Sequence, residues 1–233
     1  MKRHSPLQSW LDRNDPLGSF IDLDKRPPNY EFGGFLGIDL VVPIYESISL
    51  APESLESSWK AVNDYVDSAL ELIDSDRPHW LDHEEVFMIR EELGDPPNFC
   101  YPIYIFSVGD KEKERAVYVG KTSSSTSRFC NGHVVCAKLH RPEYEAMSKR
   151  LYLGTIVLLA DDKEYQPLEW VHPFEKAIET LNSIEAQLIY DLKPELNTHH
   201  KDENNVTVPI TPIHIQNFTE QTNFLNDHFC FPY

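Results

Sequence analysis

Residues 101–120, YPIYIFSVGDKEKERAVYVG, decide the fold because two strand-like segments flank a short polar loop. The segments 101–109 and 116–120 are rich in β-branched and aromatic residues, and every residue between them is charged. This arrangement predicts an antiparallel β-hairpin. If the hairpin is symmetric about Lys111, Tyr104 and Tyr118 are cross-strand neighbours on one face.

The segments that follow predict an α+β fold. The hydroxyl run 122–127 can cap a helix that carries Arg128 in its first turns and continues towards His140. The apolar segment 151–160 reads as a central strand, and 173–192 has the apolar spacing of an amphipathic helix. The expected fold is therefore a small mixed β-sheet with a β-β-α-β-α core.

Three regions are expected along the chain. Within the first, apolar spacing predicts helices over 53–75 and 82–93 and a short strand over 38–45, IDLVVPIY. The regions are an acidic N-terminal extension that is mixed and then largely helical (1–98), a core (99–200), and a C-terminal extension packed on the core or partly flexible (201–233).

Composition predicts a globular protein of the cytoplasm that is not bound to a membrane. No apolar run approaches the roughly 20 residues that span a bilayer, and the N-terminus lacks an apolar signal core. The four cysteines have no disulfide-framework spacing, which is typical of a reducing compartment.

The charge is strongly negative overall but unevenly placed. The chain carries a net charge of −17, and residues 1–100 hold 20 acidic against 8 basic side chains. Residues 121–150 hold six basic and two acidic side chains. A net charge of −17 argues against nucleic acid as a partner, since phosphates attract basic surfaces, whereas the basic stretch allows it locally.

Glu185 is the most informative single residue. At 100° per residue it falls within the apolar stripe that contains Phe174, Leu181 and Leu188. A carboxylate inside an apolar stripe is costly unless it is paired. Either a buried lysine or arginine satisfies it, or the stripe opens there onto a metal site.

A set of motifs in this region resembles the GIY-YIG nuclease superfamily, and most closely the N-terminal nuclease domain of UvrC-type repair proteins. As in that domain, a lysine follows the YVG motif directly, an arginine comes seven residues later, and an asparagine follows the helix glutamate by twelve. The positions concerned are PIY at 102–104, YVG at 118–120, Lys121, Arg128, Glu185 and Asn197.

The resemblance implies a metal-dependent endonuclease that hydrolyses phosphodiester bonds, with DNA as the expected substrate. It makes Glu185 the single protein ligand of Mg²⁺, for which Mn²⁺ can substitute. Tyr104 and Tyr118 would line the scissile phosphate, and Lys121 and Arg128 would stabilise phosphoryl charge. Gly120 and Asn197 would be structural residues near the site, and His133 is a further candidate, since some relatives have a histidine after this arginine.

Two other readings stay open. The chain could instead be a catalytically inactive GIY-YIG scaffold whose acidic surface binds a protein partner through the N-terminal region. That region could also mimic nucleic acid or mask the basic face of 121–150.

A zinc site is not expected from one other group of cysteines and histidines. Cys130, His133, Cys136 and His140 follow a C-x2-H-x2-C-x3-H pattern. On one continuous helix the outer pair would lie about 15 Å apart, too far to surround one zinc ion.

Overall fold

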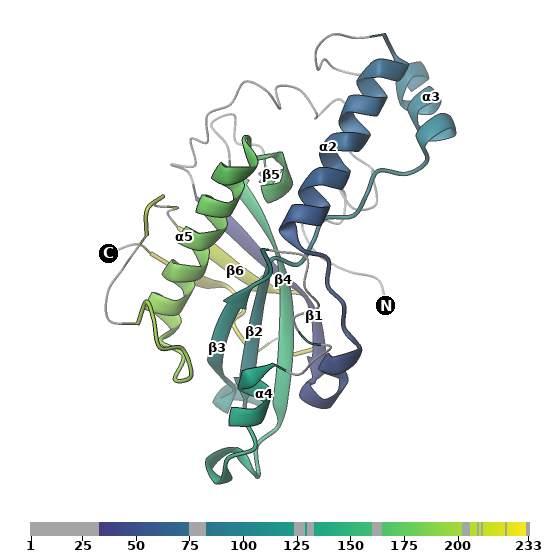
Figure 1. Cartoon of the computed structure of the whole chain (residues 1–233). Helices are drawn as coiled ribbons and strands as arrows, with labels where there is room; N and C mark the ends of the chain where they lie inside the picture. The colour runs from purple at the N-terminus through teal and green to yellow at the C-terminus, as the bar shows by residue number, and fades with distance from the viewer. Residues whose placement is uncertain are drawn as a thin grey trace.

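The computed structural model describes residues 33–74, 83–123, 129, 133–159, 165–201, 206–208, 210, 212–221 and 223–231. These residues form one seven-stranded mixed sheet with helices packed around it, so the α+β class is confirmed (Figure 1). The strand order is β3-β2-β4-β1-β6-β7, and β5 pairs with β4. No helix among the described residues is both long and apolar enough to cross a bilayer.

The helices and strands expected within 99–200 are present, in β-β-α-β-α order apart from the short β5. They are β2 (Ile103–Val108), β3 (Arg115–Lys121), α4 (Val134–Lys138), β4 (Lys149–Leu159), β5 (Tyr165–Pro167) and α5 (Phe174–Leu192). Short 3₁₀ turns lie between elements: η2 (Ile44–Ser49), η3 (Lys111–Lys113), η4 (Pro142–Tyr144) and η5 (Leu168–Trp170).

The sheet draws strands from all three expected regions. The strand β1 (Gly34–Pro43) pairs antiparallel with β4 and parallel with β6 (Ile213–Asn217), and β7 (His228–Cys230) pairs with β6. The expected divisions at residues 98 and 200 therefore do not coincide with divisions of the sheet. The largely helical extension expected over 1–98 is not established, because 1–32 lie outside the described residues and β1 belongs to the sheet.

The register of the β2–β3 hairpin differs from the expected one. Tyr104 faces Gly120, and Tyr118 faces Phe106, so the two tyrosines are diagonal neighbours and not direct partners. The loop contains a 3₁₀ turn with Lys111 at a φ of 53°, and the register shifts between Phe106 and Ser107. Because of this shift, the hairpin is not symmetric about Lys111. Both tyrosines still lie on the same face of the sheet.

The helix expected from Arg128 towards His140 is shorter than predicted. His133 is extended, with φ −87° and ψ 138°, and its side chain caps α4 by accepting from Val135 N–H. The N-cap of α4 is thus His133, and residues 124–127 of the hydroxyl run lie outside the described residues. The physical reason lies in the sequence, because Asn131-Gly132 is a strong turn signal immediately before His133.

The two faces of the sheet bury separate apolar clusters. On one face, Ile103, Ile105 and Val119 pack under α5, which supplies Leu181, Ile184 and Leu188. The opposite face carries Tyr104, Phe106, Leu151 and Leu153, which are covered by residues of α4 and its neighbours, Phe129, Val135, Leu139 and Tyr144. A side chain on β3 therefore lies either on the α5 face or on the α4 face of the sheet.

Two helices, α2 (Leu55–Leu72) and α3 (His83–Leu93), extend beyond one end of the sheet, and α3 packs against α2 (Figure 1). The N-terminal turns of α2 are fixed to the core by the buried carboxyl of Glu169. Its Oε1 accepts hydrogen bonds from Ser58 Oγ at 2.8 Å and from Cys100 N–H at 2.9 Å. The adjacent residue Trp59 adds a further contact, because its Nε1 donates to Val171 O at 3.0 Å.

We expect the isolated fragment 99–200 not to fold stably, because it exposes the edge of β4 that β1 covers and removes Leu36 and Ile38 from the core. The control is the fragment 33–233, which keeps every described strand. Urea unfolding followed by circular dichroism should be cooperative for 33–233 and broad or absent for 99–200. A cooperative transition in 99–200 would show that β1 is dispensable.

Glu169 should make stability depend on pH. Burial raises the pKa of Glu169 above its usual value of 4.5, so the folded state favours the protonated carboxyl. Its contribution is then complete below pH 4.5 and falls as pH rises through the folded pKa. The free energy of unfolding of the wild type, minus that of Glu169→Gln, should therefore decrease between pH 4 and pH 8.

Urea titrations at several pH values measure this difference, with the surface variant Glu179→Gln as the control. Curves for wild type and Glu169→Gln that run parallel across the range would contradict the assignment.

Candidate functional site

The centre of the candidate site is the contact between Tyr104 and Gly120. Tyr104 is 1% exposed, and its ring lies directly over Gly120 on the neighbouring strand. A Cβ atom added at Gly120 would lie 2.5 Å from Tyr104 Cζ and Oη. Glycine is therefore needed here for close approach of a side chain.

Tyr104, Tyr118 and His133 form one aromatic group. The two tyrosine rings stack with centroids 6.1 Å apart, and His133 lies 5.5 Å from each ring. Tyr104 Oη and His133 Nε2 are 3.1 Å apart. Because His133 Nδ1 accepts from Val135 N–H, a neutral His133 carries its proton on Nε2 and donates it to Tyr104 Oη.

Lys121 and Glu185 form a second group. Lys121, the last residue of β3, places Nζ 2.5 Å from Oε2 of Glu185 on α5, and the side chains are 22% and 16% exposed. Of the two possibilities that the apolar stripe left open, the structure shows pairing with a lysine. Both charges still reach solvent, so the pair lies at the rim of the core.

The two groups lie on opposite faces of the sheet and meet at Gly120. Side chains alternate along a strand, so Tyr118 points towards the α4 face while Lys121 points towards α5. Their Cα atoms are about 10 Å apart, from three residues of strand rise. Gly120 lies between them and has no side chain, and β3 is the edge strand of the sheet.

Asn197 holds this edge strand in place. Its Oδ1 accepts from Val119 N–H and its Nδ2 donates to Val119 O, both at 2.9 Å. The adjacent Leu196 N–H donates to Val117 O at 2.9 Å. The loop after α5 thus satisfies backbone groups that an edge strand otherwise leaves open.

Arg128, the remaining candidate, lies outside the described residues. Its neighbour Phe129 is 1% exposed, with its ring centroid 5.2 Å from that of Tyr104. The chain on either side of Arg128 is therefore anchored near the tyrosine group, at Phe129 and at Lys121.

The basic stretch 121–150 is partly neutralised by ion pairs. Arg150 contacts Asp110 at 2.9 Å and the buried Glu114 at 3.3 Å, and Lys121 pairs with Glu185. Glu114 also accepts from Ser107 Oγ and Tyr152 Oη, so Arg150 belongs to a structural network. The positive charge counted in the sequence is thus larger than the charge that faces solvent.

The residues present fit Mg²⁺ in one respect and compete with it in another. Mg²⁺ keeps most of its waters and binds through one or two carboxylates, which a partly exposed Glu185 can supply. The Lys121 ammonium already occupies one oxygen of that carboxylate. A bound ion would therefore share this carboxylate with Lys121 or displace it.

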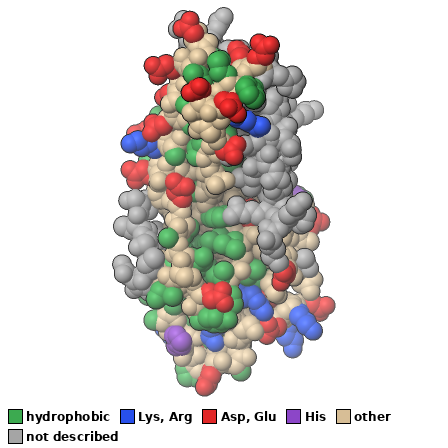
Figure 2. Space-filling model, turned by 90° about the vertical axis from the view of Figure 1, so that its right-hand side faces the viewer, with side chains coloured by type: hydrophobic (Ala, Val, Ile, Leu, Met, Phe, Trp, Pro, Cys, Tyr) green, Lys and Arg blue, Asp and Glu red, His purple; other side chains and the backbone are tan. Residues whose placement is uncertain are grey.

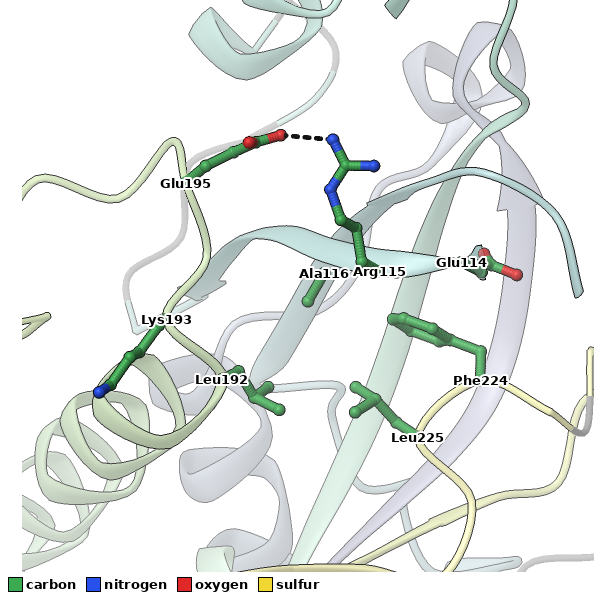
Figure 3. A pocket seen from close by; sticks show the side chains of 8 residues that line it. All are labelled: Glu114, Arg115, Ala116, Leu192, Lys193, Glu195, Phe224 and Leu225. Atoms are coloured by element: carbon green, nitrogen blue, oxygen red, sulfur yellow. Dashed lines mark hydrogen bonds and ion pairs between the residues drawn. The ribbon is translucent and has the colours of Figure 1, made fainter. Parts of the chain in front are cut away.

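An open pocket of about 390 Å³ lies near the other end of β3 (Figure 3). It is lined by Glu114, Arg115, Ala116, Leu192, Lys193, Glu195, Phe224 and Leu225. Arg115 and Glu195 pair across it at 3.1 Å. None of the expected catalytic residues lines this pocket.

Sequence reasoning missed one cluster of metal-binding side chains. Ligand atoms of Asp191, His228 and Cys230 all lie within 4.8 Å of one another. Asp191 is 37 residues from His228 along the chain, so no local spacing marked the group. It becomes visible only when β7 is placed beside α5.

Replacing Gly120 with Ala should destabilise the fold by about 1–3 kcal/mol, because the new methyl group overlaps the buried Tyr104 ring. Urea unfolding measures this cost. In a Tyr104→Leu background the ring is gone, so the same change should cost much less. Equal costs in the two backgrounds would contradict the close contact.

No protein-family model, curated protein or solved structure matches this chain.

Proposed function

We propose that this protein is a metal-dependent endonuclease that hydrolyses phosphodiester bonds, with DNA as the expected substrate. The observation that carries the proposal is the arrangement around Gly120 at the edge of the sheet. The tyrosine group approaches this residue from one face, and the Lys121–Glu185 pair lies at the next residue on the other. A phosphate beside Gly120 can contact both groups.

Each residue has a chemical role that suits its position. The Lys121 ammonium would leave Glu185 and stabilise charge on the phosphoryl oxygens, and Arg128 would add a second cation. Tyr118, half-buried beside Tyr104, would help to deprotonate the attacking water. His133 would orient Tyr104 through their hydrogen bond.

A divalent ion held by Glu185, Mg²⁺ or Mn²⁺, would supply Lewis-acid stabilisation of the phosphoryl oxygen. The protein's part is to keep the Glu185 carboxylate at the rim of the core, where it is 16% exposed.

A second candidate function is binding of a basic protein partner by an inactive scaffold. The helices α2 and α3 together carry eight carboxylates against two cations. The space-filling view shows acidic side chains concentrated at the end of the molecule that these helices form (Figure 2). Phe87 and Met88 on α3 are 66% and 39% exposed, and they would give such a surface apolar contacts.

The proposal predicts nicking of supercoiled DNA that requires Mg²⁺ or Mn²⁺. Glu185→Gln, which keeps the side-chain shape, should lower the rate by about 10²-fold or more, as removal of a transition-state stabiliser does. Arg128→Ala and Tyr118→Phe should also lower it. The matched control is Glu179→Gln on the same helix, whose carboxylate pairs with Lys176 at the surface.

The double variant Glu185→Gln/Lys121→Met separates catalysis from structure. The reference for activity is Lys121→Met alone, because Lys121 itself would contact the phosphoryl oxygens. If Glu185 only neutralises Lys121, the double variant should regain stability and nick as fast as Lys121→Met. If Glu185 binds the metal, the double variant should regain stability but nick more slowly than Lys121→Met. No cleavage of DNA or RNA under any metal and salt condition would favour the partner-binding function.

A further inference from the structure

We propose that Asp191, His228 and Cys230 bind one Zn²⁺ ion, at a site separate from Glu185. Asp191 lies in the last turn of α5, and the other two residues lie on β7, the last strand of the sheet. The three ligand atoms already lie within 4.8 Å of one another. In a tetrahedral zinc site, sulfur and nitrogen ligands are about 3.6 Å apart, from the usual bond lengths. The most distant pair therefore has to close by at most about 1 Å, while His228 Nε2 and Asp191 Oδ2, now 2.8 Å apart, have to separate slightly.

The residue types select the ion. Thiolate and imidazole ligands favour Zn²⁺ over Mg²⁺ or Ca²⁺, which prefer oxygen. Three protein ligands leave the fourth tetrahedral position for water. The burial of the group matches this arrangement, because Cys230 is buried, Asp191 is 15% exposed, and His228 is 39% exposed.

The electrostatics of α5 also favour a cation here. The C-terminal end of a helix carries partial negative charge, so a carboxylate in its last turn is unfavourable. Asp191 occupies that turn, and no basic residue lies in it. His228 Nε2 is 2.8 Å from Asp191 Oδ2, so the histidine ring is already the hydrogen-bond partner of this carboxylate.

The surrounding side chains hold the ligands in position. Gln187 lies one helical turn before Asp191, and its Nε2 donates to the backbone oxygens of Ile210 and Cys230. Its Oε1 is buried and has no hydrogen-bond partner among the described residues, so it is an acceptor available near the cluster. A metal here would join the three-residue β7 to α5 and stabilise the C-terminal end of the sheet.

Binding of the metal alone tests the proposal. The full chain is stripped with chelator and titrated with ZnCl₂, and also with CoCl₂, whose thiolate charge-transfer absorption reports a sulfur ligand. We expect one metal per chain, a thiolate–Co²⁺ band, and a rise in the unfolding temperature with Zn²⁺. His228→Ala should weaken binding at least about tenfold.

Cys230→Ser should abolish the charge-transfer band, and Cys136→Ser, the control, should keep it. The control also tests the pattern Cys130, His133, Cys136 and His140, because metal bound there would be lost in Cys136→Ser instead. Asp191→Asn is measured in parallel in case Cys230→Ser unfolds. Absence of stoichiometric zinc in the wild type, or unchanged binding in both Cys230→Ser and Asp191→Asn, would overturn the proposal.

Discussion

The missing side chain at Gly120 is the constraint on which the site depends. Because nothing projects from Gly120, the Tyr104 ring crosses to the edge strand and is buried there, with His133 bonded to its hydroxyl. For the same reason, no side chain projects from β3 at Gly120, between Tyr118 and Lys121. Asn197 then fixes the strand by bonding both backbone groups of Val119. A short stretch of β3 thus combines close packing of Tyr104 against Gly120 with a partly exposed charge at Lys121.

Lys121 and Glu185 pair with each other, and in the proposed function each would also have a ligand as a partner. Without ligands the two neutralise each other at a partly exposed position, which is a stable arrangement with modest desolvation. The pairing with Lys121 explains how a carboxylate can occupy an apolar stripe on α5. In the proposed nuclease, a phosphate would attract the ammonium and a divalent ion would attract the carboxylate, so that these two ligands together would replace the internal pair.

Elements with strong local patterns could be predicted from the sequence, and long-range placements could not. The hairpin, β4 and α5 follow from alternation and helical spacing. The register of the hairpin could not be predicted, because the loop and the bulge each shift it by one residue, so that Tyr104 faces Gly120 and not Tyr118. The candidate residues can be identified from their order along the chain. Which face of the sheet each side chain lies on depends on the strand register, which the order does not give. The cluster at Asp191 joins α5 to β7, which begins more than 30 residues later, so only the assembled sheet shows it.

The position of β1 in the middle of the sheet has a consequence for the order of folding. Leu36 pairs with Ile156, about 120 residues later, and with Ile215, later still. Such distant pairings raise the contact order and slow folding, whereas the β2–β3 hairpin closes a short loop. During synthesis β1 emerges first but has no partner until β4 has been made. This apolar strand therefore lacks its β4 partner while about half of the chain is made, a period in which chaperone binding would protect it from aggregation.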